Sequence, residues 1–169
     1  AELTQTFAAL SADPAVRVVV LAARGPAFCA GADLDWMRRV AGHTHEQNLT
    51  DARALAHMLH TVYTCDKPVI ARVQGDAFAG GVGLVAACDI AVATTDVTFC
   101  LSEVKLGLVA STIAPYVLRA VGERQARRYA LSAEKFDAQE AQRIGLIHAL
   151  CAPQMLDARV NEVQNALLQ

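Results

Sequence analysis

The sequence FAGGVGLVAACDI, from Phe78 to Ile90, carries the most information about the fold and the chemistry of this chain. Gly80 and Gly81 open an apolar segment that favours a helix. The first N–H groups of a helix have no acceptor within it, and glycine puts no side chain in front of them. An oxygen that gains negative charge can therefore be held there. A single carboxylate, Glu103, follows thirteen residues after Ile90, so the region predicts an oxyanion-binding turn with one carboxylate downstream.

A second glycine-containing turn lies upstream, in FCAGAD from Phe28 to Asp33. Each turn follows a continuous apolar run of strand character. Turns that follow neighbouring parallel strands meet at one edge of the fold, so we expect Gly31 and Gly80 to lie close together. The runs predicted as buried parallel strands of one core are Val16–Leu21, Val69–Val73 and Ile90–Ala93.

Helical patterns alternate with these strands, which predicts a layered α/β fold. A last short strand is expected at Ile147–Leu150, and the polar stretch Gly42–Glu46 is expected to be the most mobile part of the chain. Apart from the segments that begin at Ala1 and Gly80, the predicted helices are Leu49–Tyr63, Ala114–Val121, Glu123–Leu131, Ala138–Arg143 and Asp157–Gln169.

Composition limits the class of protein. A chain of 169 residues with 54% hydrophobic residues and mean hydropathy of +0.28 can bury one substantial core. A net charge of −2 gives no reason to expect nucleic acid as a partner, and no apolar run reaches the ~18 residues of a membrane span. Five cysteines without a C-x-x-C pair favour reduced thiols and a cytoplasmic location. His57 and His60 lack an acidic partner that would complete a metal site, so no metal is expected.

Five blocks of sequence, in this order and spacing, resemble the crotonase family, the enoyl-CoA hydratase/isomerase superfamily. The resemblance covers nearly the whole chain and implies a repeated ββα spiral core as the fold. The blocks are VRVVVLAARGPAFCAGADLDWM, KPVIARVQGDAFAGG, CDIAVAT, LSEVKLGL and AVGERQARRYALSAEKFDAQEAQRIGLI.

The resemblance also implies what surrounds this core. Crotonase-like proteins begin with a further strand and end with a helical region that closes the acyl pocket. We therefore expect residues 1–169 to be the core domain of a longer family-type chain, which would form a homotrimer or a dimer of trimers. The implied partner is an acyl-CoA thioester, and no separate cofactor is implied because coenzyme A is part of the substrate.

The family pattern assigns roles to residues of the two turns. The backbone N–H groups of Ala32 and Gly80 match the donors that stabilise the thioester enolate, and Glu103 matches a catalytic carboxylate. Asp33 also reads as a cap for the helix around Trp36. The residues that the resemblance implies for substrate binding are Ala30, Gly31, Ala32, Asp33, Leu34, Gly80, Gly81 and Gly83.

The chain departs from the two-glutamate hydratase pattern at Gly83, which stands where the other glutamate is found. We expect the missing side chain to leave room for a bulky or branched acyl group. Three functions stay open: a hydratase that adds water across the 2,3 double bond, a Δ3-Δ2 enoyl-CoA isomerase with Glu103 as sole acid/base, and a non-catalytic CoA-binding protein. Clp-type serine hydrolysis through Ser111 is disfavoured, because no G-x-S-x-G elbow is present. Within the family, FCAGADLDWM and LSEVKLGL look most like bacterial methylglutaconyl-CoA and γ-carboxygeranoyl-CoA hydratases.

Overall fold

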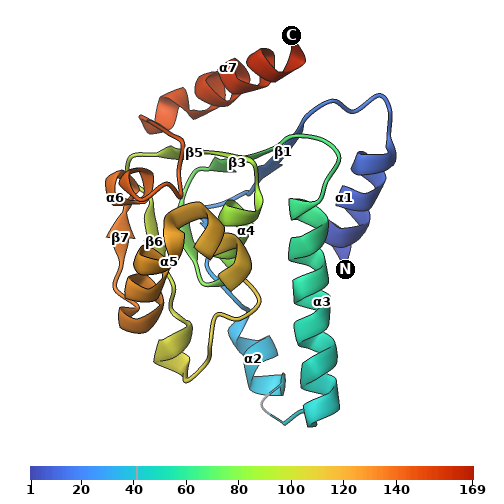
Figure 1. Cartoon of the computed structure of the whole chain (residues 1–169), viewed down its shortest axis with the longest axis vertical. Helices are drawn as coiled ribbons and strands as arrows, with labels where there is room; N and C mark the ends of the chain where they lie inside the picture. The colour runs from blue at the N-terminus through green and yellow to red at the C-terminus, as the bar shows by residue number, and fades with distance from the viewer. Residues whose placement is uncertain (41) are drawn as a thin grey trace.

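The computed structural model describes residues 1–40 and 42–169, without the side chains of Leu34, Trp36 and Arg39. Two four-stranded sheets form the centre (Figure 1). The first sheet is entirely parallel, in the order β1-β3-β5-β8, and its strands are β1 (Val19–Ala22), β3 (Val69–Val73), β5 (Ile90–Thr94) and β8 (Ala149–Cys151). The expected parallel pairing of the three main strands is confirmed.

The second sheet has the order β2-β4-β6-β7. Its first three strands are parallel and β7 is antiparallel to β6. These strands are β2 (Ala27–Cys29), β4 (Asp76–Phe78), β6 (Thr98–Cys100) and β7 (Phe136–Asp137). Each of β2, β4 and β6 directly follows a strand of the first sheet and is followed by a helix, which confirms the expected repeated ββα arrangement.

Helices cover both faces of the parallel sheet (Figure 1). On one face, Ile70 and Val92 pack against Leu156 and Val160 of the C-terminal helix. The alternate residues of the same strands face the larger core beneath the other helices. The helices are α1 (Glu2–Ala12), α2 (Leu34–Val40), α3 (His45–Tyr63), α4 (Gly80–Ala87), α5 (Ala114–Ser132), α6 (Ala138–Arg143) and α7 (Leu156–Leu168), with 3-10 turns η1 (Glu103–Leu106) and η2 (Pro153–Met155).

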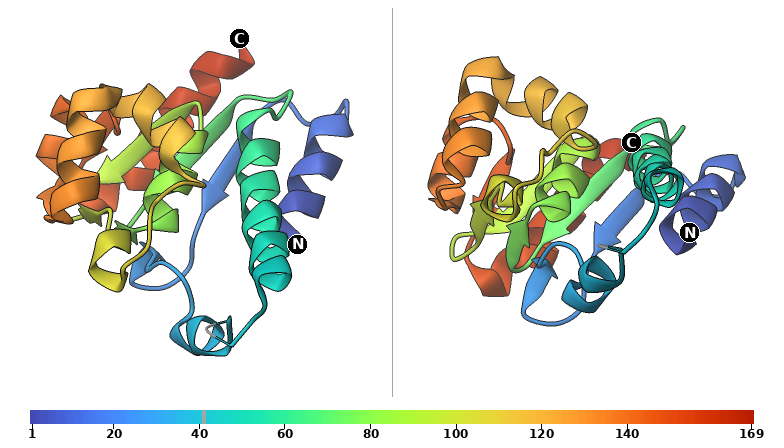
Figure 2. Two further views of the ribbon diagram at one scale, coloured as in Figure 1. Left: turned by 60° about the horizontal axis from the view of Figure 1, so that its bottom comes forward. Right: turned by 90° about the horizontal axis from the view of Figure 1, so that it is seen from below.

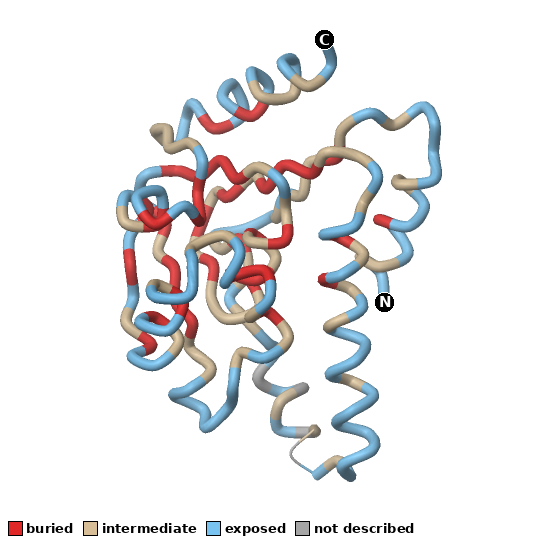
Figure 3. Tube along the Cα trace, in the orientation of Figure 1, coloured by how far each residue is buried: buried red, intermediate tan, exposed pale blue. Residues whose placement is uncertain are grey.

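The side-by-side packing of α1 and α3 is visible from both directions in Figure 2. Phe7 of α1 and Leu59 of α3 are buried in the larger core. Figure 3 shows that buried residues follow the strands and the inner helix faces, whereas the end of α3 near α2 is exposed. In residues 1–40 and 42–169, the structure contains no helix long and apolar enough to cross a lipid bilayer.

Several predicted boundaries are wrong, for local reasons. The first strand begins at Val19 rather than Val16, because the Val16 N–H donates to Asp13 O in a turn. The last strand begins at Ala149 rather than Ile147, because the Ile147 N–H donates to Ala141 O and stays with α6. By contrast, the predicted division between the helices Ala114–Val121 and Glu123–Leu131 is confirmed, because Gly122, with φ of +75°, breaks α5 there.

The third predicted helix begins earlier than Leu49, at His45. Thr44 and Gln47 form a capping box, in which each side chain accepts a hydrogen bond from the other residue's backbone N–H. The stretch Gly42–Glu46 is therefore not a loop throughout, since its last two residues are already helical. Ala41, just before it, lies outside the described residues.

Close contact between the second and fourth strands depends on Gly75. A Cβ atom there would lie 2.1 Å from Pro26 O and 3.0 Å from Ala27 Cα, which are main-chain atoms that cannot move away cheaply. We expect Gly75→Ala to lower the free energy of unfolding by about 3 kcal/mol, the upper end of overpacking costs. Urea unfolding measures the loss, with Gly80→Ala as the matched control because a Cβ at Gly80 meets no atom within 4 Å. Equal stability of the two variants would contradict this packing argument.

Candidate active site

The carboxyl ends of three adjacent parallel strands bring the predicted site segments together. Strands β2, β4 and β6 lie side by side, with Cys29 beside Ala77 and Phe78 beside Cys100. The chain continues from these strands into the Gly31 turn, the Gly80 turn and the segment that leads to Glu103. In open parallel sheets, ligands bind beyond the carboxyl ends of the strands. The topology therefore places all three segments where a ligand is expected.

The two glycine turns are in contact. A Cβ atom at Gly31 would lie 3.6 Å from Ala79 Cβ and 3.7 Å from Phe78 O, and Gly31 has a φ of +99° that favours glycine. A Cβ at Gly81 would lie only 2.7 Å from Cys29 O, so the helix that begins at Gly80 approaches the end of β2 through a residue without a side chain. The predicted proximity of the Gly31 and Gly80 turns is confirmed.

Ala79 fixes the second turn to the strand that leads to Glu103. Its N–H donates to Cys100 O at 2.8 Å, and its carbonyl accepts the N–H of Val82 at 3.0 Å, which caps α4. Ala79 has φ of +49° and ψ of −117°, a strained conformation for a residue with a Cβ. The strain shows that surrounding contacts hold this turn in one orientation.

The two predicted donors make no hydrogen bond in the part of the chain that the structure describes. Within the described residues, the backbone N–H groups of Ala32 and Gly80 have no hydrogen-bond acceptor. Ala32 is exposed, and the space beside Gly80 is open for at least 4 Å around a Cβ position. Two unpaired N–H groups on turns that touch each other are suited to hold one oxygen with developing negative charge.

Glu103 is the first residue of η1 and is partly buried. Its Oε2 atom is buried and has no hydrogen-bond partner among the described residues. Burial raises the pKa of Glu103 above its ordinary value of 4.5, and a hydrogen bond from its own backbone N–H lowers that pKa by a smaller amount. A carboxyl with a raised pKa and a free oxygen is suited to exchange protons with a bound molecule.

The raised pKa of Glu103 predicts how the stability of the protein depends on pH. Below the unfolded-state pKa, near 4.5, the Glu103 carboxyl is neutral in both the folded and the unfolded state, and its contribution to the free energy of unfolding is complete. That contribution is lost as the pH rises through the folded-state pKa. We expect Glu103→Gln, which resembles the neutral form, to be more stable than the parent at pH 7.5 and equally stable below about pH 4. Thermal unfolding at both pH values measures the difference. A glutamine variant less stable than the parent at pH 7.5 would contradict the burial argument.

The expectation of open space at Gly83 is wrong. A Cβ atom there would lie 2.2 Å from Ile113 Cγ2 and 2.6 Å from Ile113 Cβ, and Ile113 is only 1% exposed. The missing side chain is compensated by an isoleucine from the start of α5. Gly81 and Gly83, both predicted to bind substrate, are buried at close contacts between elements.

The remaining predicted residues belong to the first turn. Ala30 and Asp33 are exposed, and the Met37 N–H donates to Asp33 O at 2.9 Å, so Asp33 begins α2 as expected for a helix cap. The prediction for the Leu34 side chain lies outside the described residues. The Gly31 turn leads directly into α2, which lies at the lower end of the molecule in Figure 1.

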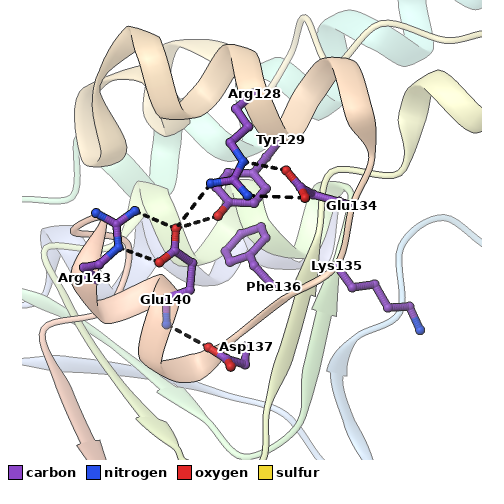
Figure 4. A pocket seen from close by; sticks show the side chains of 8 residues that line it. All are labelled: Arg128, Tyr129, Glu134, Lys135, Phe136, Asp137, Glu140 and Arg143. Atoms are coloured by element: carbon purple, nitrogen blue, oxygen red, sulfur yellow. Dashed lines mark hydrogen bonds and ion pairs between the residues drawn. The ribbon is translucent and has the colours of Figure 1, made fainter.

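A polar cavity of about 340 Å³ lies between α5, β7 and α6 (Figure 4). The Glu140 carboxylate is the shared acceptor in this cavity. It accepts hydrogen bonds from Arg143, at 2.5 and 2.7 Å, and from the Tyr129 hydroxyl, at 2.6 Å. These bonds hold the pKa of Glu140 at about 2, and burial together with Glu140 raises the pKa of Tyr129 to about 12. Arg128 is paired with Glu134 at 2.6 Å.

Sequence reasoning missed this cluster. The sequence feature that could have revealed the cluster is the recurrence of acidic residues at positions 134, 137 and 140 after a basic helix. Arg128 pairs with Glu134 and Arg143 pairs with Glu140, while the Asp137 carboxylate accepts the Glu140 N–H. The hydrogen bond from Tyr129 to Glu140 joins α5 to α6. Lys135 points away from it in Figure 4, with Nζ 5.4 Å from the centre of the Phe78 ring.

A smaller apolar cavity, about 190 Å³, lies beside the segment after β6. Its lining includes Leu101, two residues before Glu103, and Ile113, the residue that contacts Gly83. The rest of the lining comes from small and apolar side chains of α5 and the chain before it, apart from Arg127. The cavity therefore begins close to the candidate acid/base group.

Comparison with known proteins decides the family. The sequence profile described as enoyl-CoA hydratase/isomerase matches residues 1–169. The chain belongs to this enoyl-CoA hydratase/isomerase family. It is similar to a putative enoyl-CoA hydratase of Thermus thermophilus, with 42% identity over 89% of this chain and 60% of the relative. It is also similar to mevalonyl-coenzyme A hydratase of Aspergillus fumigatus, with 34% identity over 99% of this chain and 61% of that relative.

A solved structure gives the same result for the fold. The crystal structure of an enoyl-CoA hydratase from Shewanella pealeana matches with a TM-score of 0.95 and 46% identity, over 99% of this chain and 62% of the other. The crotonase-like α/β fold expected from the sequence is therefore confirmed. The chain spans about three fifths of the length of these relatives.

Proposed function

We propose that the protein is an enoyl-CoA hydratase that adds water across the 2,3 double bond of an enoyl-CoA thioester. The observation that carries the proposal is the pair of N–H groups, of Ala32 and Gly80, that have no acceptor among the described residues. They lie on turns that meet beside the segment bearing Glu103. Two donors for an enolate oxygen and one carboxyl with a raised pKa are the groups that this reaction needs.

In the proposed mechanism the thioester oxygen accepts hydrogen bonds from the N–H groups of Ala32 and Gly80. The Glu103 carboxylate takes a proton from water while the water oxygen bonds to the β carbon, and the π electrons move to form the enolate. The enolate then collapses, and its α carbon takes the proton back from Glu103. The substrate gains one water molecule and the carboxylate is regenerated, so one acid/base group completes the cycle.

A Δ3-Δ2 enoyl-CoA isomerase is the second candidate, because the side chain at position 83 is absent and Ile113 fills its space. Glu103 would take a proton from the α carbon of a 3-enoyl thioester and return it to the γ carbon. A non-catalytic CoA-binding protein is disfavoured, since it would have no need of a buried carboxylate oxygen without a partner among the described residues.

A branched or carboxylated acyl group, such as that of methylglutaconyl-CoA, is the proposed substrate. Support comes from the blocks FCAGADLDWM and LSEVKLGL, and from the similarity to a relative named for mevalonyl-coenzyme A. We propose no cofactor besides the coenzyme A of the substrate, and a cytoplasmic location. Exposed apolar side chains at Val104, Leu106, Leu108 and Val109 support the proposal that copies of the chain associate, as in the expected trimer.

Separate incubation with 2-enoyl and 3-enoyl thioesters of CoA tests the function. Loss of absorbance from the conjugated double bond, together with a hydroxyacyl-CoA product heavier by one water, is expected with the 2-enoyl substrates. Conversion of a 3-enoyl to a 2-enoyl thioester without water addition would favour the isomerase. Absence of both reactions over a panel of linear, branched and carboxylated acyl groups would contradict both enzymatic proposals.

A further inference from the structure

Ala79 makes a sharp turn between a strand and a helix. β4 ends at Phe78 and α4 begins at Gly80, so this one residue connects them. Its φ of +49° and ψ of −117° lie outside the conformations that a residue with a Cβ adopts freely. The turn is therefore strained, and the contacts around it hold it in place.

Small residues stand on both sides of this turn. Ala77, two residues before Ala79, is fully buried, and Gly81 follows two residues after it. A Cβ at Gly81 would lie 2.7 Å from Cys29 O, so the end of β2 leaves no room for a side chain there. We call residues 77–81, with the strained turn at their centre, the elbow.

A turn of this kind carries the nucleophile in one large class of acyl-transfer enzymes. There, a strained strand-to-helix turn exposes one side chain at the end of the sheet, between small residues two positions before and after it. The backbone N–H of the next residue forms part of the oxyanion hole. In this chain the next residue is Gly80, whose N–H is one of the two candidate donors. Ala79 thus occupies the place of a nucleophile but carries only a methyl group.

The methyl group of Ala79 also faces the other donor turn. A Cβ at Gly31 would lie 3.6 Å from Ala79 Cβ, and Ala32, the second candidate donor, directly follows Gly31. The residue after Ala79 supplies one N–H group, and the turn against its methyl group supplies the other. The side chain at position 79 therefore lies beside the place where a carbonyl group would be held by both donors.

We propose that Ala79 determines which reaction this oxyanion hole supports: with no nucleophile at position 79, the thioester bond stays intact. The proposal rests on the proposed function. Formation of an enolate and attack on the carbonyl carbon both place negative charge on the same oxygen, so the same two donors stabilise either one. A thiol in place of the methyl group would attack that carbon. The methyl group of Ala79 leaves only the enolate route.

Ala79→Cys tests the proposal with a saturated acyl-CoA thioester, which has no double bond to hydrate. The introduced thiol loses its proton and its sulfur bonds to the thioester carbon, while the bond from that carbon to the sulfur of coenzyme A breaks. Coenzyme A leaves as a thiolate and takes up a proton, and the acyl group stays on the protein as a new thioester. Mass spectrometry of the intact protein measures the added acyl group, and chromatography measures the released coenzyme A.

Ala30→Cys is the matched control, because position 30 is exposed in the Gly31 turn and lies outside the elbow. We expect Ala79→Cys to be acylated at least about 10²-fold faster than Ala30→Cys or the five native cysteines, the factor usual for one donor of an oxyanion hole. Equal rates for the two variants, or no acylation of Ala79→Cys that is folded by circular dichroism, would overturn the proposal. Acylation of the parent at Cys29 as fast as that of Ala79→Cys would overturn it as well.

Thermal unfolding tests the strained turn without any substrate. Glycine adopts a positive φ freely, so Ala79→Gly is expected to raise Tm by up to about 4 °C. Ala86→Gly, at a partly buried position of α4 with no such strain, is expected to lower Tm by about 2–4 °C. Equal losses of Tm in the two variants would overturn the elbow on which the proposal rests.

The two proposals fail separately. Hydration of 2-enoyl thioesters by the parent, without acylation of Ala79→Cys, would overturn only the role of Ala79. Acylation of Ala79→Cys, without turnover of any enoyl thioester by the parent, would support the role of Ala79 and contradict the proposed hydratase.

Discussion

Glu103→Gln is expected to lower kcat for hydration of an enoyl-CoA thioester by at least about 10²-fold, the range usual for loss of a general acid/base group. Glutamine keeps the size of the side chain and one hydrogen-bond acceptor, but cannot take a proton from water. KM is expected to change little, because the thioester oxygen is held by the backbone groups of Ala32 and Gly80. Steady-state kinetics with a 2-enoyl thioester measure both constants.

The pH dependence of the parent gives a second measurement. Because burial raises the pKa of Glu103, hydration is expected to decline with falling pH already above the ordinary value of 4.5. The pH profile of Glu103→Gln should lack this decline at low pH, and its rate of hydration should be low at every pH. Glu46→Gln, an exposed position in the first turn of α3, is the matched control and should keep parent kinetics. Near-parent kcat in Glu103→Gln would remove Glu103 from the mechanism.

The main strands and the meeting of the two turns could be predicted from sequence, because they depend on strong local patterns. Val69–Val73 is a continuous apolar run, and the strand is buried on both faces, as that pattern indicates. The Gly31 and Gly80 turns follow neighbouring parallel strands in each sheet, so right-handed crossovers bring them to the same edge. Glu103 could be placed because it follows β6 in the same arrangement.

The short strands of the second sheet could not be predicted in the same way. β2 and β4 each have three residues, too few to show a period of two, and β2 starts directly after Pro26. Their pairing is decided by contacts distant in sequence, such as the approach of Gly75 to Pro26 O. The sequence shows a glycine at position 75, but it does not show that the Pro26 carbonyl oxygen lies against it.

Gly83 shows the same limit within the site. A missing side chain leaves space only if no other residue fills it, and interiors pack too densely for that to be assumed. Ile113, thirty positions later, fills the space from another helix. The steric pair could have been suspected only from a correlation between the two positions in related chains. The prediction of room for an acyl group is therefore wrong, whereas position 83 does lack a carboxylate.

Gly81→Ala is expected to lower kcat/KM by about 10²-fold, since small displacements of positioned groups cost that much. The new Cβ would lie 2.7 Å from Cys29 O and 2.8 Å from Cys29 Cβ. Cys29 ends β2, directly before the turn that carries Ala32, so relief of the clash moves that turn away from α4. The two N–H donors would then no longer reach one oxygen together.

The neighbouring glycine supplies the control for that experiment. Gly80→Ala adds the same methyl group one residue earlier, where no atom lies within 4 Å, and is expected to keep the parent Tm. Gly81→Ala is expected to cost about 1–3 kcal/mol of stability and still to fold, so its kinetics can be measured well below its Tm. Parent-like kcat/KM in a measurably destabilised Gly81→Ala would show that the spacing of the two turns does not set the rate. A large loss of kcat/KM with unchanged secondary structure is the expected result, because the close contact between Gly81 and Cys29 keeps both donors within reach of the same oxygen.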